Sequence, residues 1–317
     1  MQTADFVHKP VLFDEVIESL RIKQGGIYVD GTTGGAGHSS GIAEKLVDGR
    51  LISFDRDADA IAVATERLAR FGERSTVVHS NFSEVKSVLL SMGIDRIDGL
   101  LLDLGVSSYQ LDCAQRGFSY MADAPLDMRM DKRDAISAYD VVNGYSAAEL
   151  KRILFEYGEE RFAPSIANAI VRAREIKPIE STLELSDIIK SGMPAHARNG
   201  AHHPAKKSFQ AIRICVNGEL SIIENTIRDA ASIMNNGGII SIITFHSLED
   251  RIVKQTFADL AKGCTCPKSF PVCICGNKPS LEVVSRKPII PSAEELEVNP
   301  RSRSAKLRVA MRVNQNQ

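Results

Sequence analysis

The stretch Asp30-Gly31-Thr32-Thr33-Gly34-Gly35-Ala36-Gly37-His38 stands between an apolar segment, 26–30, and an amphipathic one, about 38–46. The first segment is typical of a strand and the second of a helix. In an open parallel sheet, this turn brings backbone N–H groups close to a ligand, and only small residues permit that approach. The sequence therefore predicts a strand, a ligand-binding glycine turn and a helix.

The same alternation continues on both sides of this turn. Strands are predicted at 51–55, 76–79 and 99–103, and helices at 11–20, 58–71 and 83–92. Strands that are apolar throughout belong in a parallel sheet covered by helices on both faces. A polar stretch at 105–134, predicted as a long loop, is followed by helical patterns alone, and strands return at 239–244, 281–285 and 306–313.

Two domains follow from this pattern. We expect a discontinuous α/β domain, residues 1–112 and 216–317, that is interrupted by an all-helical insert, 113–215. Within the insert, Ser146 and Ser181 each precede a Glu by three residues, which predicts a capping box at two helix starts. A further helix is predicted over about 163–176 and a last one over about 219–235, stopped by Gly237-Gly238.

Composition narrows the class of protein. The 317 residues are 44% apolar and 25% charged, which excludes a disordered or collagen-like chain. The longest apolar runs are too short for a membrane helix, and the first residues lack a secretory signal, so we expect a cytoplasmic protein without a membrane partner. The net charge of −1 argues against a nucleic-acid partner, but 191–218 and 299–312 are basic and hold no acid. Such segments suit phosphate contacts, with a solvated basic face as the alternative.

An acid at the end of the second predicted strand points to the ligand. Asp55 follows the glycine turn by about 20 residues, where a carboxylate can accept hydrogen bonds from ribose hydroxyls. The spacing of Gly35, Gly37 and Gly41 misses the nicotinamide fingerprint by one residue, and no phosphate loop ending in Gly-Lys-Ser/Thr is present. Asp30, just before the glycines, suits the cationic sulfonium and amine of S-adenosylmethionine. The alternative is a turn that only packs helix on strand.

Other strand ends agree with one site. Phe82 follows the third strand and could place its ring against an adenine, although such a ring is more often part of a core. Asp103 ends the fourth strand, where a reacting group would be held, although an Asp there is more often a helix cap. The polar stretch after it, with Phe118 and Tyr120, is expected to form the wall of a substrate pocket, with a disordered or merely packing loop as the alternative.

Sequence blocks spread over nearly the whole chain carry a family resemblance. They are His8-Lys9-Pro10-Val11-Leu12, the glycine turn, Leu102-Asp103-Leu104-Gly105-Val106-Ser107-Ser108 with Gln110-Leu111-Asp112, Arg116-Gly117-Phe118-Ser119, Pro125-Leu126-Asp127-Met128-Arg129-Met130-Asp131, His203-Pro204-Ala205, Phe209-Gln210-Ala211-Ile212-Arg213, Thr244-Phe245-His246-Ser247-Leu248-Glu249-Asp250-Arg251 and the run from Asn299 to Arg308. By these blocks the chain resembles the bacterial ribosomal RNA small-subunit methyltransferase H family, also called MraW. The resemblance implies a Rossmann-like class I S-adenosylmethionine-dependent methyltransferase that carries a helical insert. Its implied substrate is the exocyclic N4 of one cytosine in the decoding region of 16S rRNA, within the small ribosomal subunit.

The resemblance also implies site residues. Cofactor contacts carry over to Ala36, Gly37, His38, Asp55, Phe82, Asp103 and Gln110. Many members have Gly where this chain has Ala36. We expect Asp103 to be catalytic, because an acceptor hydrogen-bonded to the N4 amino group could localise its lone pair; a neighbouring backbone carbonyl, Ser107 and Ser108 are further candidates.

Several alternatives stay open. The chain contains no Pro-Pro pair, the mark of many other amine-directed nucleic-acid methyltransferases, so the N4 specificity rests on the resemblance. A non-catalytic cofactor-binding module that docks on the ribosome, or a methyltransferase for proteins or small molecules, would share much of this pattern. The oligomeric state is also open, with a homodimer among the states allowed.

Four cysteines form a separate pattern. Cys264-Thr265-Cys266 and Cys273-Ile274-Cys275 could hold Zn²⁺, but structural sites more often separate paired ligands by two or more residues. Reduced or paired thiols in a loop after the fifth strand are the alternative. Because such short spacings strain a four-cysteine site and methyl transfer needs no metal, the sequence favours no metal site. His246, at the end of the fifth strand, is expected to be a helix cap or a site residue.

Overall fold

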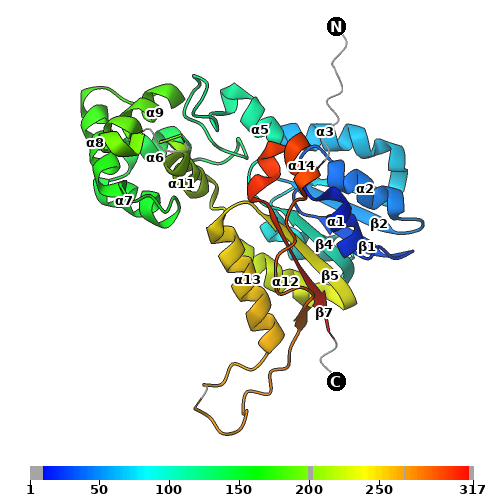
Figure 1. Cartoon of the computed structure of the whole chain (residues 1–317). Helices are drawn as coiled ribbons and strands as arrows, with labels where there is room; N and C mark the ends of the chain where they lie inside the picture. Colours follow the sequence, from blue (N-terminus) through cyan, green and yellow to red (C-terminus); the bar gives the residue numbers. More distant parts are fainter. Residues whose placement is uncertain (1–9, 199–202, 268, 314–317) are drawn as a thin grey trace. The chain divides into compact units, whose positions relative to one another are not determined.

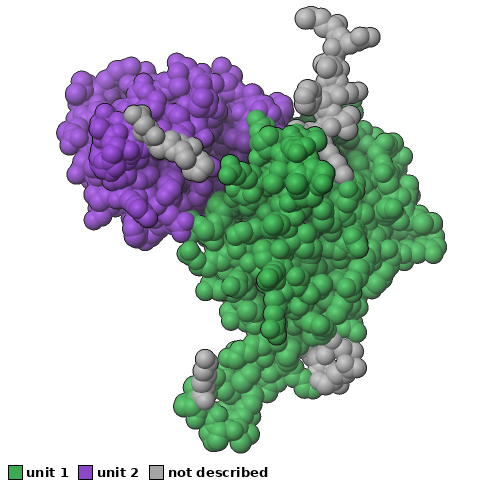
Figure 2. Space-filling view, in the orientation of Figure 1, with its two compact units in different colours: residues 1–105, 221–317 green, residues 106–220 purple. Residues whose placement is uncertain are grey.

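The computed structural model describes residues 10–198, 203–267 and 269–313 (Figure 1). His8 and Lys9 of the first sequence block lie outside these ranges. Two compact units divide the chain (Figure 2): residues up to Gly105 with those from Ser221 onward form unit 1, and Val106–Leu220 form unit 2. The expected boundaries, 112/113 and 215/216, thus fall inside unit 2. The sequence could not show that the short helix after Gly105 and the residues that follow the last insert helix pack with the insert.

Unit 1 is built on one seven-stranded sheet. Its strands are β1 (Ile27–Asp30), β2 (Arg50–Asp55), β3 (Ser75–His79), β4 (Ile97–Asp103), β5 (Met234–Thr244), β6 (Leu281–Val283) and β7 (Lys306–Arg312). They lie in the order β3-β2-β1-β4-β5-β7-β6. The first five pair in parallel, and β7 runs antiparallel to both β5 and β6. The predicted α/β sheet is therefore confirmed.

Helices cover the sheet. They are α1 (Phe13–Ser19), α2 (Gly37–Lys45), α3 (Ala58–Leu68), α4 (Val85–Ser91), α12 (Ile223–Ile233), α13 (Ser247–Lys262) and α14 (Ala293–Val298), with 3₁₀ turns at Ala69–Arg74, Phe82–Glu84 and Pro300–Ser304. Helix α2 packs against α1 and α3, whereas α12 packs against α4 and α13. Because parallel crossovers are right-handed and the strand order reverses at β1, these two groups cover opposite faces. No helix among the described residues is long and apolar enough to cross a membrane.

The region before β5 departs from the prediction. Strand β5 begins at Met234, before the two glycines that were expected to stop a helix at 237–238. Its register against β4 shifts, with Ile97 opposite Met234 and Gly99 opposite Ile239. The extra residues are accommodated by a bulge in which Gly237 has a φ of +75°. The extent of helix α13 was also not predicted, and the cysteines follow that helix and not β5 directly.

Unit 2 is helical. It contains α5 (Ser108–Asp112), α6 (Ala138–Gly144), α7 (Ala147–Glu156), α8 (Ala163–Ile176), α9 (Thr182–Ser191), α10 (Ala195–Arg198), α11 (Lys206–Asn217) and a 3₁₀ turn at Ala114–Arg116. Ser146 and Glu149 form the predicted capping box at α7. At α9, Ser181 accepts from the Glu184 backbone N–H, but the Glu184 carboxylate accepts from the Glu180 N–H instead. That capping box is therefore only half formed.

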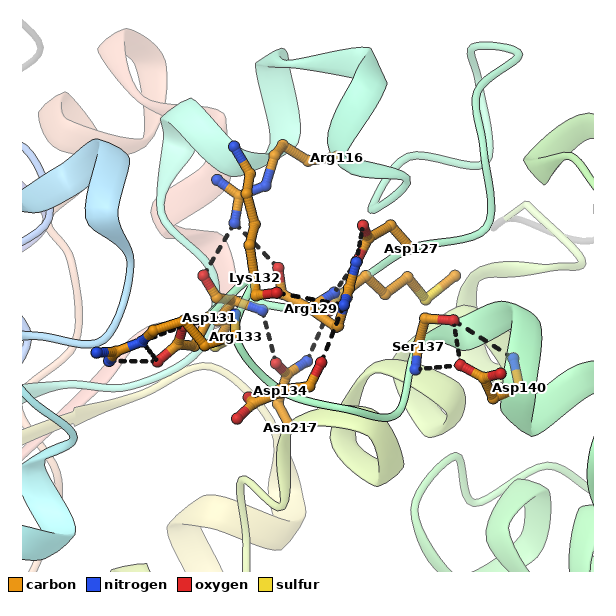
Figure 3. Close-up of polar contacts among 12 residues, drawn as sticks. Arg116, Asp127, Arg129, Asp131, Lys132, Arg133, Asp134, Ser137, Asp140 and Asn217 are labelled. Atoms are coloured by element: carbon orange, nitrogen blue, oxygen red, sulfur yellow. Dashed lines mark hydrogen bonds and ion pairs between the residues drawn. The ribbon is translucent and has the colours of Figure 1, made fainter.

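The polar stretch 105–134 is an ordered part of unit 2 and not a simple loop (Figure 3). The buried Arg116 donates to the carbonyls of Arg129 and Met130 at 2.9 and 3.0 Å. Asn217 clamps the same segment, since it accepts from the Met130 N–H at 2.8 Å and donates to the Met128 carbonyl at 2.8 Å. Phe118 lies in the core of this unit. The burial of Phe118 favours the alternative in which this stretch only packs, and the expected wall of a substrate pocket stays a prediction.

Candidate cofactor and active site

Three carboxylates end neighbouring strands of the sheet. Asp30, Asp55 and Asp103 are the last residues of β1, β2 and β4. Strands β2 and β4 flank β1 in parallel register, so the three side chains share the carboxyl edge of the sheet. In open α/β sheets ligands bind beyond this edge, where the strand order reverses.

Asp30 is fully enclosed at the base of this edge. It accepts hydrogen bonds from the Thr32 backbone N–H at 3.1 Å and from the Ser39 hydroxyl at 2.7 Å. Burial is the main reason why its pKa is raised, to about 6, and the nearby Asp55 adds to that effect. A buried carboxylate of this kind is a favourable neighbour for a cation.

Asp55 shapes the glycine turn. Its carboxylate accepts from the Gly34 N–H at 2.7 Å and from the Asp57 N–H at 2.9 Å. Burial raises the pKa of Asp55, although these backbone donors oppose the rise. Because each carboxylate oxygen has a further lone pair, both oxygens can still accept a ribose hydroxyl.

Two positions of the turn restrict the residue type, Gly31 through lack of space and Ala36 through its backbone conformation. A side chain at Gly31 would bring its Cβ within 2.4 Å of Leu102 Cδ2 and 3.1 Å of Phe82 Cβ. Phe82 thus borders the same edge of the sheet. Ala36 adopts a left-handed conformation, φ 59°, which explains why glycine suits this position. The Ala36 methyl group is buried against Ala64 and Leu68.

His38 is the first buried side chain of α2. Its Nε2 lies 3.1 Å from the Val11 carbonyl, so Nε2 donates and Nδ1 carries no proton in the neutral ring. Burial lowers its pKa to about 4, which keeps the ring neutral at pH 7. Nδ1 lies 3.8 Å from Asp103 Oδ2, too far for a hydrogen bond.

Asp103 is the least satisfied polar group at this edge. Its backbone N–H donates to the Thr32 hydroxyl at 2.6 Å, but Oδ1 is buried and has no hydrogen-bond partner. The side chain as a whole is 26% exposed, so solvent reaches the part of it other than Oδ1. Burial, Asp30 and Glu249 together raise the pKa of Asp103 to about 8. A cation placed here would give Oδ1 a partner and would offset the repulsion of Asp103 by Asp30 and Glu249.

Glu249 was not singled out by the sequence analysis as a site residue. It lies in the first turn of α13, is 1% exposed, and its carboxylate accepts from the Phe245 N–H at 2.8 Å. His246 caps the same helix, because its Nδ1 accepts from the Glu249 N–H at 3.4 Å, and its Nε2 lies 3.1 Å from Glu249 Oε1. The helix-cap alternative for His246 is confirmed. The signal that could have revealed Glu249 is its place three residues after a cap.

Gln110 belongs to unit 2, and its side chain takes part in the cap of a helix. Its side-chain oxygen accepts from the Ser107 N–H at 3.0 Å, and Ser107 Oγ accepts from the Gln110 N–H at 3.2 Å. The two residues form a capping box that begins α5. Ser107 is therefore committed to the helix start.

Most basic residues of the two acid-free segments have partners elsewhere in the chain. Arg213 forms two 2.9 Å bonds with Glu219, and Arg308 bonds both carboxylate oxygens of Asp250. Lys206 is exposed and forms no ion pair with any described residue. Acids from other parts of the chain thus neutralise several of these basic side chains, so the two segments are less suited to phosphate contacts than their sequences indicate.

The fold and the edge together define a class of protein. A seven-stranded sheet with one antiparallel strand, β7, a glycine turn after β1 and an acid ending β2 is the architecture of class I S-adenosylmethionine-dependent methyltransferases. The three carboxylates and the unpartnered Asp103 Oδ1 fit a cofactor that carries a sulfonium and an ammonium group.

Comparisons with known proteins identify the family. The model of the MraW methylase family matches residues 5–313. The chain is 55% identical over 311 residues to the ribosomal RNA small subunit methyltransferase H of Brevibacillus brevis, covering 98% of this chain and 99% of that protein. It is 57% identical over 310 residues to the protein of the same name from Clostridioides difficile, covering 98% and 100%. A putative rRNA-methylase structure from Clostridium thermocellum aligns with a TM-score of 0.42 at 12% identity, covering 95% of each chain.

The chain therefore belongs to the MraW methylase family. It is a methyltransferase, and S-adenosylmethionine is its methyl donor.

Proposed function

We propose that this protein methylates the exocyclic N4 of a cytosine in the 16S rRNA of the small ribosomal subunit. Two relatives that share more than half of its residues over nearly full length are named small-subunit rRNA methyltransferases. The observation that carries the proposal is made at Asp103. This residue ends β4 at the cofactor edge, and its Oδ1 is buried without a hydrogen-bond partner. A ribosomal substrate also implies that the enzyme acts in the cytoplasm.

Each proposed site residue has a task that its position allows. Asp55 would accept the ribose hydroxyls, Phe82 would border the adenine, and the turn at 36–38 would approach the cofactor through its backbone. Gln110 is a further proposed contact, through the part of its amide that does not cap α5.

Methyl transfer to N4 requires that the protein position the donor and the cytosine and supply one hydrogen-bond acceptor for the amino group. When bound, S-adenosylmethionine would supply an electrophilic methyl carbon, which N4 attacks in line with the C–S bond as the thioether sulfur leaves. Asp103 would accept a hydrogen bond from the cytosine amino group, which localises the N4 lone pair and directs it along the line of attack. The alkylated nitrogen then carries an extra proton, and the Asp103 carboxylate is the base in reach of it. A pKa near the working pH suits that transfer.

The raised pKa of Asp103 predicts a pH dependence of cofactor binding. The free protein holds this carboxyl protonated below about pH 8, whereas a bound cation favours the ionised form. Binding should release a proton, so affinity should rise about tenfold per pH unit below pH 8 and level off above it. Calorimetry in buffers of different ionisation enthalpy measures the released proton. Asp103→Asn should bind without this slope, and a wild-type affinity independent of pH between 6.5 and 8 would contradict the assignment.

The substrate is tested directly by labelled methyl transfer to small subunits that lack the modification, followed by nucleoside analysis. Label in N4-methylcytosine supports the proposal. Label in another nucleoside rejects the specificity, and label in protein rejects the RNA substrate. A chain that binds the donor but transfers nothing to subunits would be the non-catalytic module.

The helical unit is proposed to recognise the RNA, and Lys206 offers a test. It is exposed at the first position of α11 and has no acidic partner among the described residues, so it can contact a phosphate. Lys206→Glu should raise the KM for subunits several-fold, leave kcat unchanged, and lower the salt dependence by about one phosphate contact. The acid should not harm the fold, because a negative charge is favourable at a helix start. Lys151→Glu, an exposed lysine of α7, is the matched control; equal effects in both variants would remove α11 from the RNA surface.

A further inference from the structure

The chain makes a long excursion between α13 and β6, seen in Figure 1 as the extended segment that runs from the end of α13. Cys264 and Cys266 lie on its outgoing arm, and Cys273 and Cys275 lie on its returning arm. The four sulfur atoms all lie within 4.8 Å of one another. Both short Cys-x-Cys pairs therefore face one centre, although their spacing alone argued that a single site would be strained.

The distances between the sulfur atoms fit one ion. Cys273 Sγ lies 3.5 Å from the sulfurs of Cys264 and Cys275 and 3.9 Å from that of Cys266, while Cys264 and Cys275 are 3.9 Å apart. Four thiolates at about 2.3 Å from a tetrahedral zinc ion stand ~3.8 Å from one another. All four cysteines are free, so no disulfide competes for these sulfurs.

Backbone groups already point at two of the sulfurs. The Thr265 N–H lies 3.4 Å from Cys275 Sγ, and the Ile274 N–H lies 3.3 Å from Cys266 Sγ. Each donor sits on the arm opposite to the sulfur that it contacts. Donors of this kind stabilise the negative charge of metal-bound thiolates and fix their orientation.

Few other contacts of the described residues hold the excursion, apart from a 3.1 Å hydrogen bond from Asn277 Nδ2 to Thr265 Oγ1 between its arms. Its apolar side chains Phe270, Val272 and Ile274 are 46%, 70% and 74% exposed, so it has almost no core of its own. Its base is closed where the Ser280 N–H donates to the Leu260 carbonyl at 2.9 Å. A segment that buries so little apolar surface gains its order from other links, of which a bound metal is the usual one.

We propose that Cys264, Cys266, Cys273 and Cys275 form a structural zinc site that fastens the two arms of this excursion. Four protein ligands fill the coordination sphere and leave no open position, which is the mark of a structural site and not of a catalytic one. The site is separate from the methyl-transfer chemistry, and its failure would leave the proposed function untouched.

The test measures metal in the full-length chain, purified without chelators. We expect one zinc per chain, lost in the double variant Cys264→Ser/Cys273→Ser and kept in Cys215→Ser, which replaces a cysteine of the helical unit. Removal of the metal should also make the chain sensitive to trypsin at the exposed Lys262, where the excursion begins, while binding of the methyl donor stays unchanged.

A second measurement does not depend on how well the serine variants fold. Cobalt(II) added to the metal-free wild-type chain should give the intense visible absorption of a tetrahedral tetrathiolate, and one equivalent of zinc should abolish it. Substoichiometric zinc together with no such spectrum overturns the proposal. Iron bound in place of zinc overturns the choice of ion.

Discussion

Replacement of Asp103 by alanine is expected to abolish methyl transfer, with kcat/KM lower by about 10²–10⁴-fold. The substitution removes the only carboxylate at the cofactor edge with a buried, unpartnered oxygen among the described residues. It therefore removes both a partner for the donor's positive charge and the acceptor for the cytosine amino group. Single-turnover transfer to small subunits, together with donor affinity from calorimetry, separates these two losses.

Two control variants test whether the loss of transfer is due to the charge and the position of Asp103. Asp103→Asn keeps the shape but not the charge, so it should retain part of the donor affinity and still lose transfer. Asp95→Ala removes an exposed acid shortly before the same strand and should behave as the wild type. Near wild-type turnover by Asp103→Ala would defeat the catalytic assignment.

The second large effect is expected on stability, from the ion pair between α13 and β7. Asp250 accepts from Arg308 Nε at 2.6 Å and from Nη2 at 3.1 Å; the Arg308 side chain is buried, and the Asp250 side chain is 14% exposed. Asp250→Ala would leave the guanidinium enclosed without a counter-charge. We expect the free energy of unfolding to fall by about 3–5 kcal/mol, measured by urea denaturation.

The double variant Asp250→Leu/Arg308→Met tests whether the unpaired charge is the cause. It should recover most of the loss, because it replaces the pair with apolar side chains of similar size. An Asp250→Ala chain as stable as the wild type would show that Arg308 finds another partner.

The same pair predicts an acid sensitivity. Burial alone would raise the pKa of Asp250, but the hydrogen bonds and charges of Arg308 and Lys306 outweigh it and hold the pKa below its ordinary value. A carboxyl with a lowered folded pKa contributes stability above its unfolded pKa, about 4, and loses it as the pH falls through the folded value. The wild type should thus lose this contribution below about pH 4, and Asp250→Ala should not.

Local patterns predicted those parts of the molecule in which neighbours along the chain decide the structure. The strand, turn and helix around Asp30, and the bounds 163–176 of α8, follow from periodicity and capping. The bulge at Gly237 escaped prediction because a register shift is decided by the facing strand. The extent of helix α13 was not predicted, because His246 is not a typical cap residue and marked a helix start only as one of two alternatives.

Contacts between distant residues explain the remaining differences. The basic run ending at Arg312 looked free of acids because Asp250, which pairs with Arg308, lies far earlier in the chain. The convergence of the four cysteines was invisible for the same reason, since a spacing does not show how two arms face each other. Glu249 likewise influences the pKa of Asp103 only because the pairing of β4 with β5 brings two distant parts of the chain together.

The strand order has a consequence for how the protein is made. Strand β7, residues 306–312, is synthesised last among the strands, yet it lies between β5 and β6 and supplies Arg308 to α13. The helical unit is one continuous stretch of chain and can complete its fold while translation proceeds. The sheet cannot do so, because one edge of β5 stays unpaired until residues 306–312 have left the ribosome. The nascent chain thus passes through a stage in which the helical unit is finished while the sheet is still open to aggregation.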